Sequence, residues 1–150
     1  MRRKERHFTA ATPHVRRFSN LGEHGAVWVG IAAAGVLADR EQRGRWARAG
    51  LAVEVAHWGA VAVKRVIGRQ RPLLEELPAL IATPTTLSFP SAHAAGSFAA
   101  ARAFGGLVPG PVLYPFAAAM ALSRPYLGVH YPSDIAAGAV LGTVVGGVLR

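Results

Sequence analysis

The segment IAAGAVLGTVVGGVL, residues 135–149, constrains the fold of this chain more than any other part of the sequence. It contains no charged residue, so a helix built from it has no polar face, and such a helix must be buried in protein or lipid. A chain of 150 residues has room to bury about one such helix in its own core. Four more apolar blocks precede it, at 24–38, 49–63, 94–108 and 110–123.

The five blocks predict an all-α fold, a polytopic membrane bundle of about five transmembrane helices. Each block is shorter than the roughly 20 residues of a typical membrane span. Apolar runs as short as these blocks also occur in core helices of soluble proteins. Capping signals lengthen the helices, so that the first runs from about 21 to 38, or ~27 Å. These signals are Asn20 with Glu23, Ser91, Ser133 and Pro111.

A glycine repeat in the last block indicates close helix packing. Gly138, Gly142 and Gly146 follow one another at four-residue intervals. Small residues at this spacing allow membrane helices to approach closely. We therefore expect the last helix to contact a neighbour through this face.

The charge distribution indicates which partners the chain has. The formal net charge is +9, and the basic residues flank the apolar blocks. This arrangement fits a bilayer with anionic headgroups better than nucleic acid. Residues 1–20 are basic but lack the apolar core of a signal peptide, which predicts a retained tail or interfacial segment before a helical membrane domain at 21–150.

Folding the helices up and down collects polar residues at one end of the bundle. The N-terminus and the loops at 64–92 and 124–133 share this side, whereas the loop at 39–48 lies opposite. Three cations, two imidazoles and one carboxylate meet there, a combination typical of an oxyanion site. These residues are Lys64, Arg71, Arg124, His93, His130 and Asp134.

The spacing of the basic residues favours phosphate binding. Lys64 and Arg71 are seven residues apart, two turns along a helix that we expect Pro72 to end, so both face one anion. Ser91 to His93 opens another helix, whose free N–H groups favour phosphate.

The two histidines suggest phosphoryl transfer. His130 and Asp134 are four residues apart, so the carboxylate can hold one ring nitrogen and leave the other free to attack phosphorus. His93 can then protonate the leaving oxygen. The three cations can neutralise the developing charge, so no metal or other cofactor is expected.

Three segments together resemble a known signature. KRVIGRQRP (64–72), PSAH (90–93) and SRPYLGVHYPSD (123–134) match, in order and spacing, the type 2 phosphatidic acid phosphatase superfamily, over 71 of the 150 residues. The resemblance implies a lipid phosphatase with a phosphohistidine intermediate. It assigns phosphate binding to Lys64, Arg71, Arg124 and Ser91, acid/base catalysis to His93, nucleophilic attack to His130 and its orientation to Asp134. Ala92 occupies a position where the signature has glycine.

A narrower resemblance concerns the substrate. The Ala/Arg/Gly-rich composition and the segment TPTTLSFPSAHAAGSFAAARAFG are similar to the actinobacterial phosphatases of decaprenylphosphoryl-5-phosphoribose. This implies a polyprenyl-linked substrate that loses its 5-phosphate. The alternatives are an undecaprenyl diphosphate or phosphatidyl phosphate phosphatase, a catalytically silent membrane adaptor, and a basic peripheral membrane or nucleic-acid binder.

Two ionisable residues interrupt the second block. Glu54 and His57 share a helix face with Lys64, and Glu54 lies ten residues, or ~15 Å, from it. Intramembrane ionisable groups are functional candidates, so we expect support beneath the phosphate site, with a role in substrate or proton handling as the alternative.

The orientation in an inner membrane follows from the positive-inside rule. Leaving out the three proposed phosphate ligands, eight basic residues lie on the site side and five opposite, which predicts a site facing the cytoplasm. The eight are Arg2, Arg3, Lys4, Arg6, Arg16, Arg17, Arg65 and Arg69, and the five are Arg40, Arg43, Arg45, Arg48 and Arg150.

Overall fold

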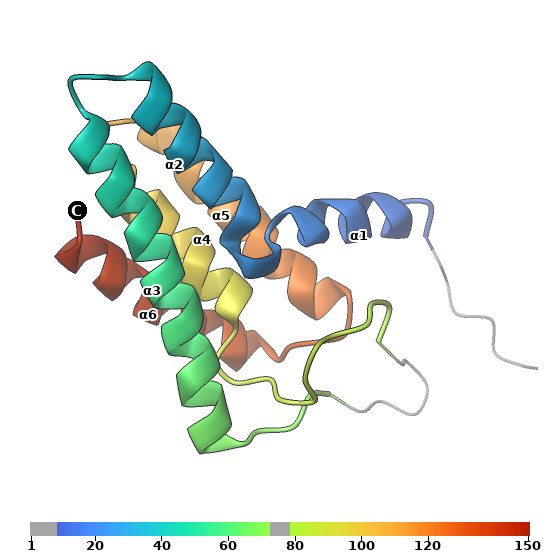
Figure 1. Ribbon diagram of the computed structural model, residues 1–150. Helices are drawn as coiled ribbons and strands as arrows, with labels where there is room; N and C mark the ends of the chain where they lie inside the picture. The colour runs from blue at the N-terminus through green and yellow to red at the C-terminus, as the bar shows by residue number, and fades with distance from the viewer. Residues whose placement is uncertain (1–8, 73–78) are drawn as a thin grey trace, which may run out of the picture.

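Every regular element in the described part of the chain is a helix (Figure 1). The computed structural model describes residues 9–72 and 79–150. The elements are α1 (Thr12–Leu21), the 3-10 helix η1 (Glu23–Gly25), α2 (Ala26–Ala38), α3 (Arg43–Ile67), α4 (Ala92–Ala103), α5 (Gly110–Tyr126) and α6 (Pro132–Val148). The all-α prediction is therefore confirmed.

Helix α4 is the centre of the bundle. Nine of its 12 residues are buried, and it packs against α3, α5 and α6 (Figure 1). Its sequence, AHAAGSFAAARA, consists mainly of small residues. Because short side chains keep the interaxial distance small, three helices can surround α4 closely.

The face of α6 that carries the glycine repeat packs on α4, as the spacing predicts. A Cβ atom added at Gly138, Gly142 or Gly146 would contact backbone atoms of α4, among them the carbonyl oxygens of Ser91, Ala95 and Ala99. Any side chain larger than hydrogen would therefore separate the two helices.

Aromatic side chains fill the end of the bundle away from the start of α4. The ring centroid of Phe104 is 6.2 Å from that of Trp28 and 5.7 Å from that of Trp46. The indole nitrogen of Trp28 donates a hydrogen bond to Ser97 Oγ at 3.1 Å. These two tryptophans belong to the core, whereas Trp58 is 53% exposed.

The outer surface carries many large apolar side chains. Leu37, Val66 and Val148 are each at least 78% exposed, and they lie on three different helices. No single described helix is both long enough and apolar enough to cross a membrane. Helix α1 and the η1–α2 segment, which are bent by 51° relative to each other, reach the required length and apolar composition only together.

The first helix differs from its expected course. A single helix over 21–38 was expected, but η1 separates α1 from α2, with His24 at φ 51° and Gly25 at φ 70°. The expected capping box of Asn20 and Glu23 does not form, because α2 begins only at Ala26, with Gly25 as its N-cap. The break leaves Glu23 and His24 exposed, on the lining of a pocket at one end of the bundle.

Two further helix ends were placed wrongly. Helix α3 ends at Ile67, with the left-handed Gly68 (φ 67°) as its C-cap, so Arg71 lies in the following loop and not on the helix of Lys64. Helix α6 begins at Pro132 with Tyr131 as N-cap, so Ser133 is inside its first turn. The N-cap at Ser91 and the early proline at position 111 are confirmed.

We expect Gly142→Ala to lower the free energy of unfolding by ~1–3 kcal/mol, because the new methyl group overlaps the backbone of α4. Gly30→Ala is the matched control: nothing lies within 4 Å of a Cβ at Gly30, and alanine in a helix interior is favoured over glycine by ~0.5–1 kcal/mol. Thermal unfolding followed by circular dichroism under identical solvent conditions measures both. Equal melting temperatures for the two variants would contradict the close packing.

Candidate active site

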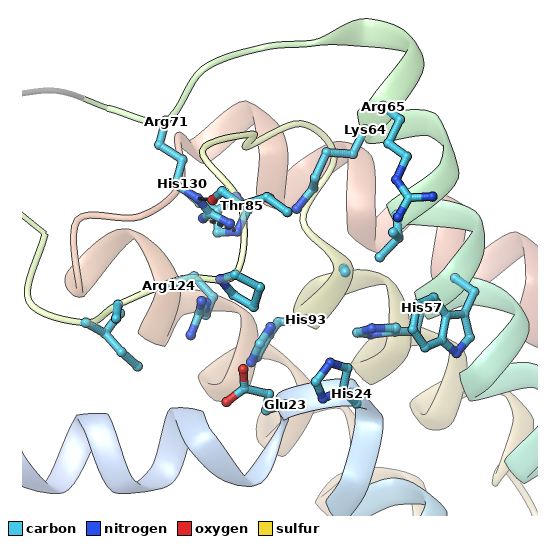
Figure 2. A pocket seen from close by; sticks show the side chains of 16 residues that line it. Glu23, His24, His57, Lys64, Arg65, Arg71, Thr85, His93, Arg124 and His130 are labelled. Atoms are coloured by element: carbon cyan, nitrogen blue, oxygen red, sulfur yellow. Dashed lines mark hydrogen bonds between the residues drawn. The ribbon is translucent and has the colours of Figure 1, made fainter.

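A pocket of about 210 Å³ opens where α3 and α5 end and α4 begins. Figure 2 shows side chains from these helices, from η1 and from the intervening loops converging on it. Its lining includes five of the residues predicted to form an oxyanion site, together with Ala92 and His57. Those five are Lys64, Arg71, His93, Arg124 and His130.

Asp134 holds His130 from behind the pocket. Its carboxylate is fully buried, and Oδ2 lies 3.3 Å from His130 Nδ1. The same oxygen accepts a hydrogen bond from the backbone N–H of Tyr131 at 2.8 Å. The imidazole is therefore fixed between the start of α6 and the pocket, as the four-residue spacing predicts.

Arg71 determines which nitrogen of His130 carries no proton. Its Nη1 lies 3.2 Å from His130 Nε2 and donates to the carbonyl of Val129 at 2.7 Å. Since a guanidinium only donates, Nε2 accepts, and the proton belongs on Nδ1, which faces Asp134. The lone pair of Nε2 therefore points at the side of the pocket where the cations gather.

Burial and the nearby cations lower the pKa of His130 well below its ordinary value, with the guanidinium of Arg71 as the largest of the charge effects. Burial also lowers the pKa of Arg71, an effect that the Asp134 carboxylate opposes. A neutral imidazole is the nucleophilic form. The site thus keeps His130 in that form over a wide pH range.

Lys64 and Arg124 add two buried positive charges. They are 6% and 5% exposed, and Arg124 Nη1 donates to Ser19 Oγ at 2.8 Å. None of the carboxylates within 9–72 and 79–150 forms an ion pair with Lys64, Arg71 or Arg124. A bound anion would provide the charge compensation that buried cations require.

The start of α4 contributes unequally to the pocket. Ala92 and His93 line it, whereas the fully buried Ser91 does not. The Ser91 hydroxyl accepts from Ala94 N at 3.4 Å, and its backbone N–H donates to the carbonyl of Asp134 at 3.0 Å. Ser91 thus caps α4 and ties it to α6, and a contact of its hydroxyl with phosphate stays a prediction.

Arg69, Glu23 and His24 are among the residues at the site that the sequence did not predict there. Arg69 Nη1 lies 3.1 Å from Asp134 Oδ1, and its guanidinium lies 4.3 Å from the centre of the Tyr131 ring. Glu23 and His24 line the pocket from η1 (Figure 2). The left-handed pair at 24–25 brings them there, and Gly22 and Gly25 around them were the available sequence signal for a break.

The two ionisable residues of α3 have different surroundings. His57 is 5% exposed and lines the pocket, and its supporting role at the phosphate site stays a prediction. Glu54 is not among the lining residues, and its carboxylate accepts a hydrogen bond from the Trp58 indole at 2.9 Å. Within the described part of the chain, no three His, Asp or Glu side chains have the arrangement of a metal site.

The chain has clear similarities to known proteins. The PAP2 superfamily model matches residues 45–150. The decaprenylphosphoryl-5-phosphoribose phosphatase of Mycolicibacterium smegmatis is 46% identical over 125 residues, covering 82% of this chain and 68% of the relative. The protein of the same name from Mycobacterium tuberculosis (strain H37Rv) is 43% identical over 134 residues, covering 89% and 76%.

Two solved structures share the fold. LpxE of Aquifex aeolicus superposes with a TM-score of 0.76 at 22% identity, covering 92% of this chain and 84% of that one. A transmembrane PAP2 type phosphatidylglycerolphosphate phosphatase from Bacillus subtilis gives a TM-score of 0.75 at 21% identity, covering 92% and 74%. The match to the PAP2 model and the relatives at 43–46% identity confirm the resemblance found in the three sequence segments.

The contact between Arg71 and His130 predicts a change in the pH profile. In Arg71→Gln the charge that disfavours imidazolium is gone, so the acid limb of kcat/KM moves to higher pH, while kcat/KM at its maximum falls roughly 10²-fold. Arg16→Gln removes the same charge from the exposed side of α1 and should leave the limb in place. Phosphate release from a lipid phosphate, measured against pH, tests this. An acid limb at the same pH in both variants would contradict the assigned role of Arg71.

Proposed function

The chain belongs to the PAP2 superfamily and is a phosphoric monoester hydrolase that acts on lipid phosphates; from this membership and the geometry of the pocket, we propose that its substrate is decaprenylphosphoryl-5-phosphoribose, which loses the 5-phosphate. The observation that carries the site assignment is the His130 imidazole, held by Asp134 with Nε2 toward the partly buried Arg71 and the side of the pocket that also holds two buried cations. The substrate follows the names of the relatives at 43–46% identity.

The proposed reaction has two steps. His130 Nε2 attacks phosphorus, the bond from phosphorus to the ribose C5 oxygen breaks, and that oxygen takes a proton from His93. The resulting phosphohistidine is hydrolysed by a water that gives its proton back to His93, which releases inorganic phosphate. Lys64, Arg71 and Arg124 stabilise the charge on the equatorial oxygens in both steps.

The membrane setting is also part of the proposal. The apolar side chains exposed on α2, α3, α5 and α6 would contact lipid if these helices, with α4, form about five spans. α1 would lie at the interface as part of the basic segment 1–20, of which residues 1–8 are outside the described structure, and 21–150 would be the catalytic domain. Anionic headgroups would then meet the basic flanks.

The orientation rests on the basic residues. We propose a multi-pass protein of the inner membrane with its site toward the cytoplasm, because eight basic residues flank the site side and five the other. Four of the eight, Arg2, Arg3, Lys4 and Arg6, lie outside the described residues. A cytoplasmic site fits a phosphosugar lipid made on the inner face. An undecaprenyl diphosphate phosphatase, the runner-up, would need an external site.

His130→Ala should abolish turnover, because among the described imidazoles of the pocket only His130 is held by a carboxylate. The measurement is phosphate release from decaprenylphosphoryl-5-phosphoribose, undecaprenyl diphosphate and phosphatidic acid in detergent, with acid-labile label on the protein trapped by rapid quenching. Thr143→Ala, on α6 outside the pocket, serves as the control for folding and extraction. Undiminished labelling of His130→Ala would falsify the assignment of the nucleophile, and an inactive wild-type chain would favour the silent adaptor.

The orientation can be tested with single cysteines, since the natural chain has none. His14 on α1 and Glu41 between α2 and α3 are both exposed, so labelling reports the side of the membrane and not burial. In intact cells, Glu41→Cys should react with an impermeant maleimide and His14→Cys should react only after lysis. The reverse pattern would overturn the cytoplasmic site.

A further inference from the structure

The pocket has a second wall that the phosphoryl-transfer mechanism does not use. It consists of Glu23 and His24 from η1 and His57 and Trp58 from α3, all of which line the same pocket as the cations. In Figure 2 the labelled members lie on the side of the pocket away from Arg71 and His130. We propose that this wall is a subsite for the hydroxylated sugar ring to which the scissile phosphate is attached.

The three rings of the wall form one packed cluster. The centroids of His24 and Trp58 are 6.2 Å apart with their planes 26° from parallel, and His57 meets Trp58 edge-on at 5.3 Å. Trp58 is nevertheless 53% exposed. An indole held in place by its neighbours but open on one side is a rigid apolar platform, against which the C–H face of a sugar ring packs.

Polar groups around this platform suit hydroxyl groups. His57 is 5% exposed, and its Nδ1 finds no hydrogen-bond partner among the residues that the structure describes. An unsatisfied buried nitrogen is costly, and a ligand hydroxyl can satisfy an imidazole as donor or acceptor. The exposed Glu23 carboxylate, on the opposite element, adds two acceptor oxygens at the edge of the pocket. A bare lipid tail would leave His57 Nδ1 without a partner.

The backbone at His24 supports a binding role. His24 adopts φ 51° and ψ 24°, and the following Gly25 has φ 70°, so two consecutive residues are left-handed. A non-glycine residue in this region costs ~1–3 kcal/mol and persists only where its surroundings hold it. Here the conformation directs both Glu23 and His24 into the pocket.

The position of the wall relative to the phosphate ligands fits a sugar phosphate. His57 precedes Lys64 by seven residues on α3, which is about two turns or ~10 Å of helix. Lys64, His57 and Trp58 line one pocket. A ligand whose phosphate lies at Lys64 can therefore extend its attached group along α3 to His57 and Trp58. This inference rests on the proposed function, since it names the part of the pocket that selects a phosphorylated sugar.

The test compares two soluble inhibitors, ribose 5-phosphate and inorganic phosphate, which share the phosphate and differ in the sugar. The reporter is whichever of decaprenylphosphoryl-5-phosphoribose and phosphatidic acid the wild-type protein hydrolyses faster, so the inhibition constants stay measurable even if the proposed substrate fails. We expect ribose 5-phosphate to bind about tenfold more tightly than phosphate, the order expected for one aromatic contact and one hydrogen bond.

Trp58→Ala and His24→Ala should reduce this preference to near unity while the inhibition constant of phosphate changes far less. Leu51→Ala, on the same helix with the same 53% exposure, should keep it. An undiminished preference in Trp58→Ala, no preference in the wild-type protein, or an equal loss for both inhibitors would each overturn the subsite. Failure to hydrolyse the phosphoribosyl lipid, by contrast, would overturn the proposed substrate.

Discussion

The carboxylate of Asp134 is the interaction on which the rest of the site depends. It accepts from the Tyr131 backbone at 2.8 Å, contacts Arg69 at 3.1 Å and holds His130 at 3.3 Å. The carbonyl of the same residue accepts from Ser91 N, which starts α4. One fully buried residue thus fixes the first turns of α4 and α6 together with the nucleophile. Because α4 and α6 also meet along the glycine face, the catalytic geometry follows from how closely two helices pack.

The electrostatics of the pocket follow from that geometry. Two buried cations and the partly buried Arg71 line a pocket in which none of the described carboxylates pairs with them, and such an arrangement is unfavourable unless an anion is bound. The cations also disfavour imidazolium at His130, so they create the phosphate affinity and the neutral nucleophile together. Asp134 lies behind the ring, where it orients His130 without forming an ion pair with Lys64, Arg71 or Arg124.

Much of this could be predicted from the sequence, because the apolar blocks and the spacing of charged residues depend on local periodicity. The helical fold, the glycine contact of α6 and the convergence of Lys64, Arg71, His93, Arg124 and His130 were all predicted. The helix ends were less predictable, although Gly68 was the signal that α3 ends before Arg71 and Pro132 the signal that Tyr131 caps α6. Whether the Ser91 hydroxyl contacts phosphate depends on which way one side chain turns, and spacing does not contain that information.

The break at η1 shows what periodicity alone misses. A straight helix over 21–38 would satisfy the apolar pattern, yet it would place Glu23 and His24 on a helix surface. The left-handed pair instead folds them into the pocket beside His57 and Trp58. The phosphate ligands lie in segments shared with the superfamily signature, whereas this wall lies outside all three of them. In a small bundle with little room for inserted loops, a bend in the first helix and one face of α3 are where selectivity for the group bearing the phosphate can vary without disturbing the chemistry.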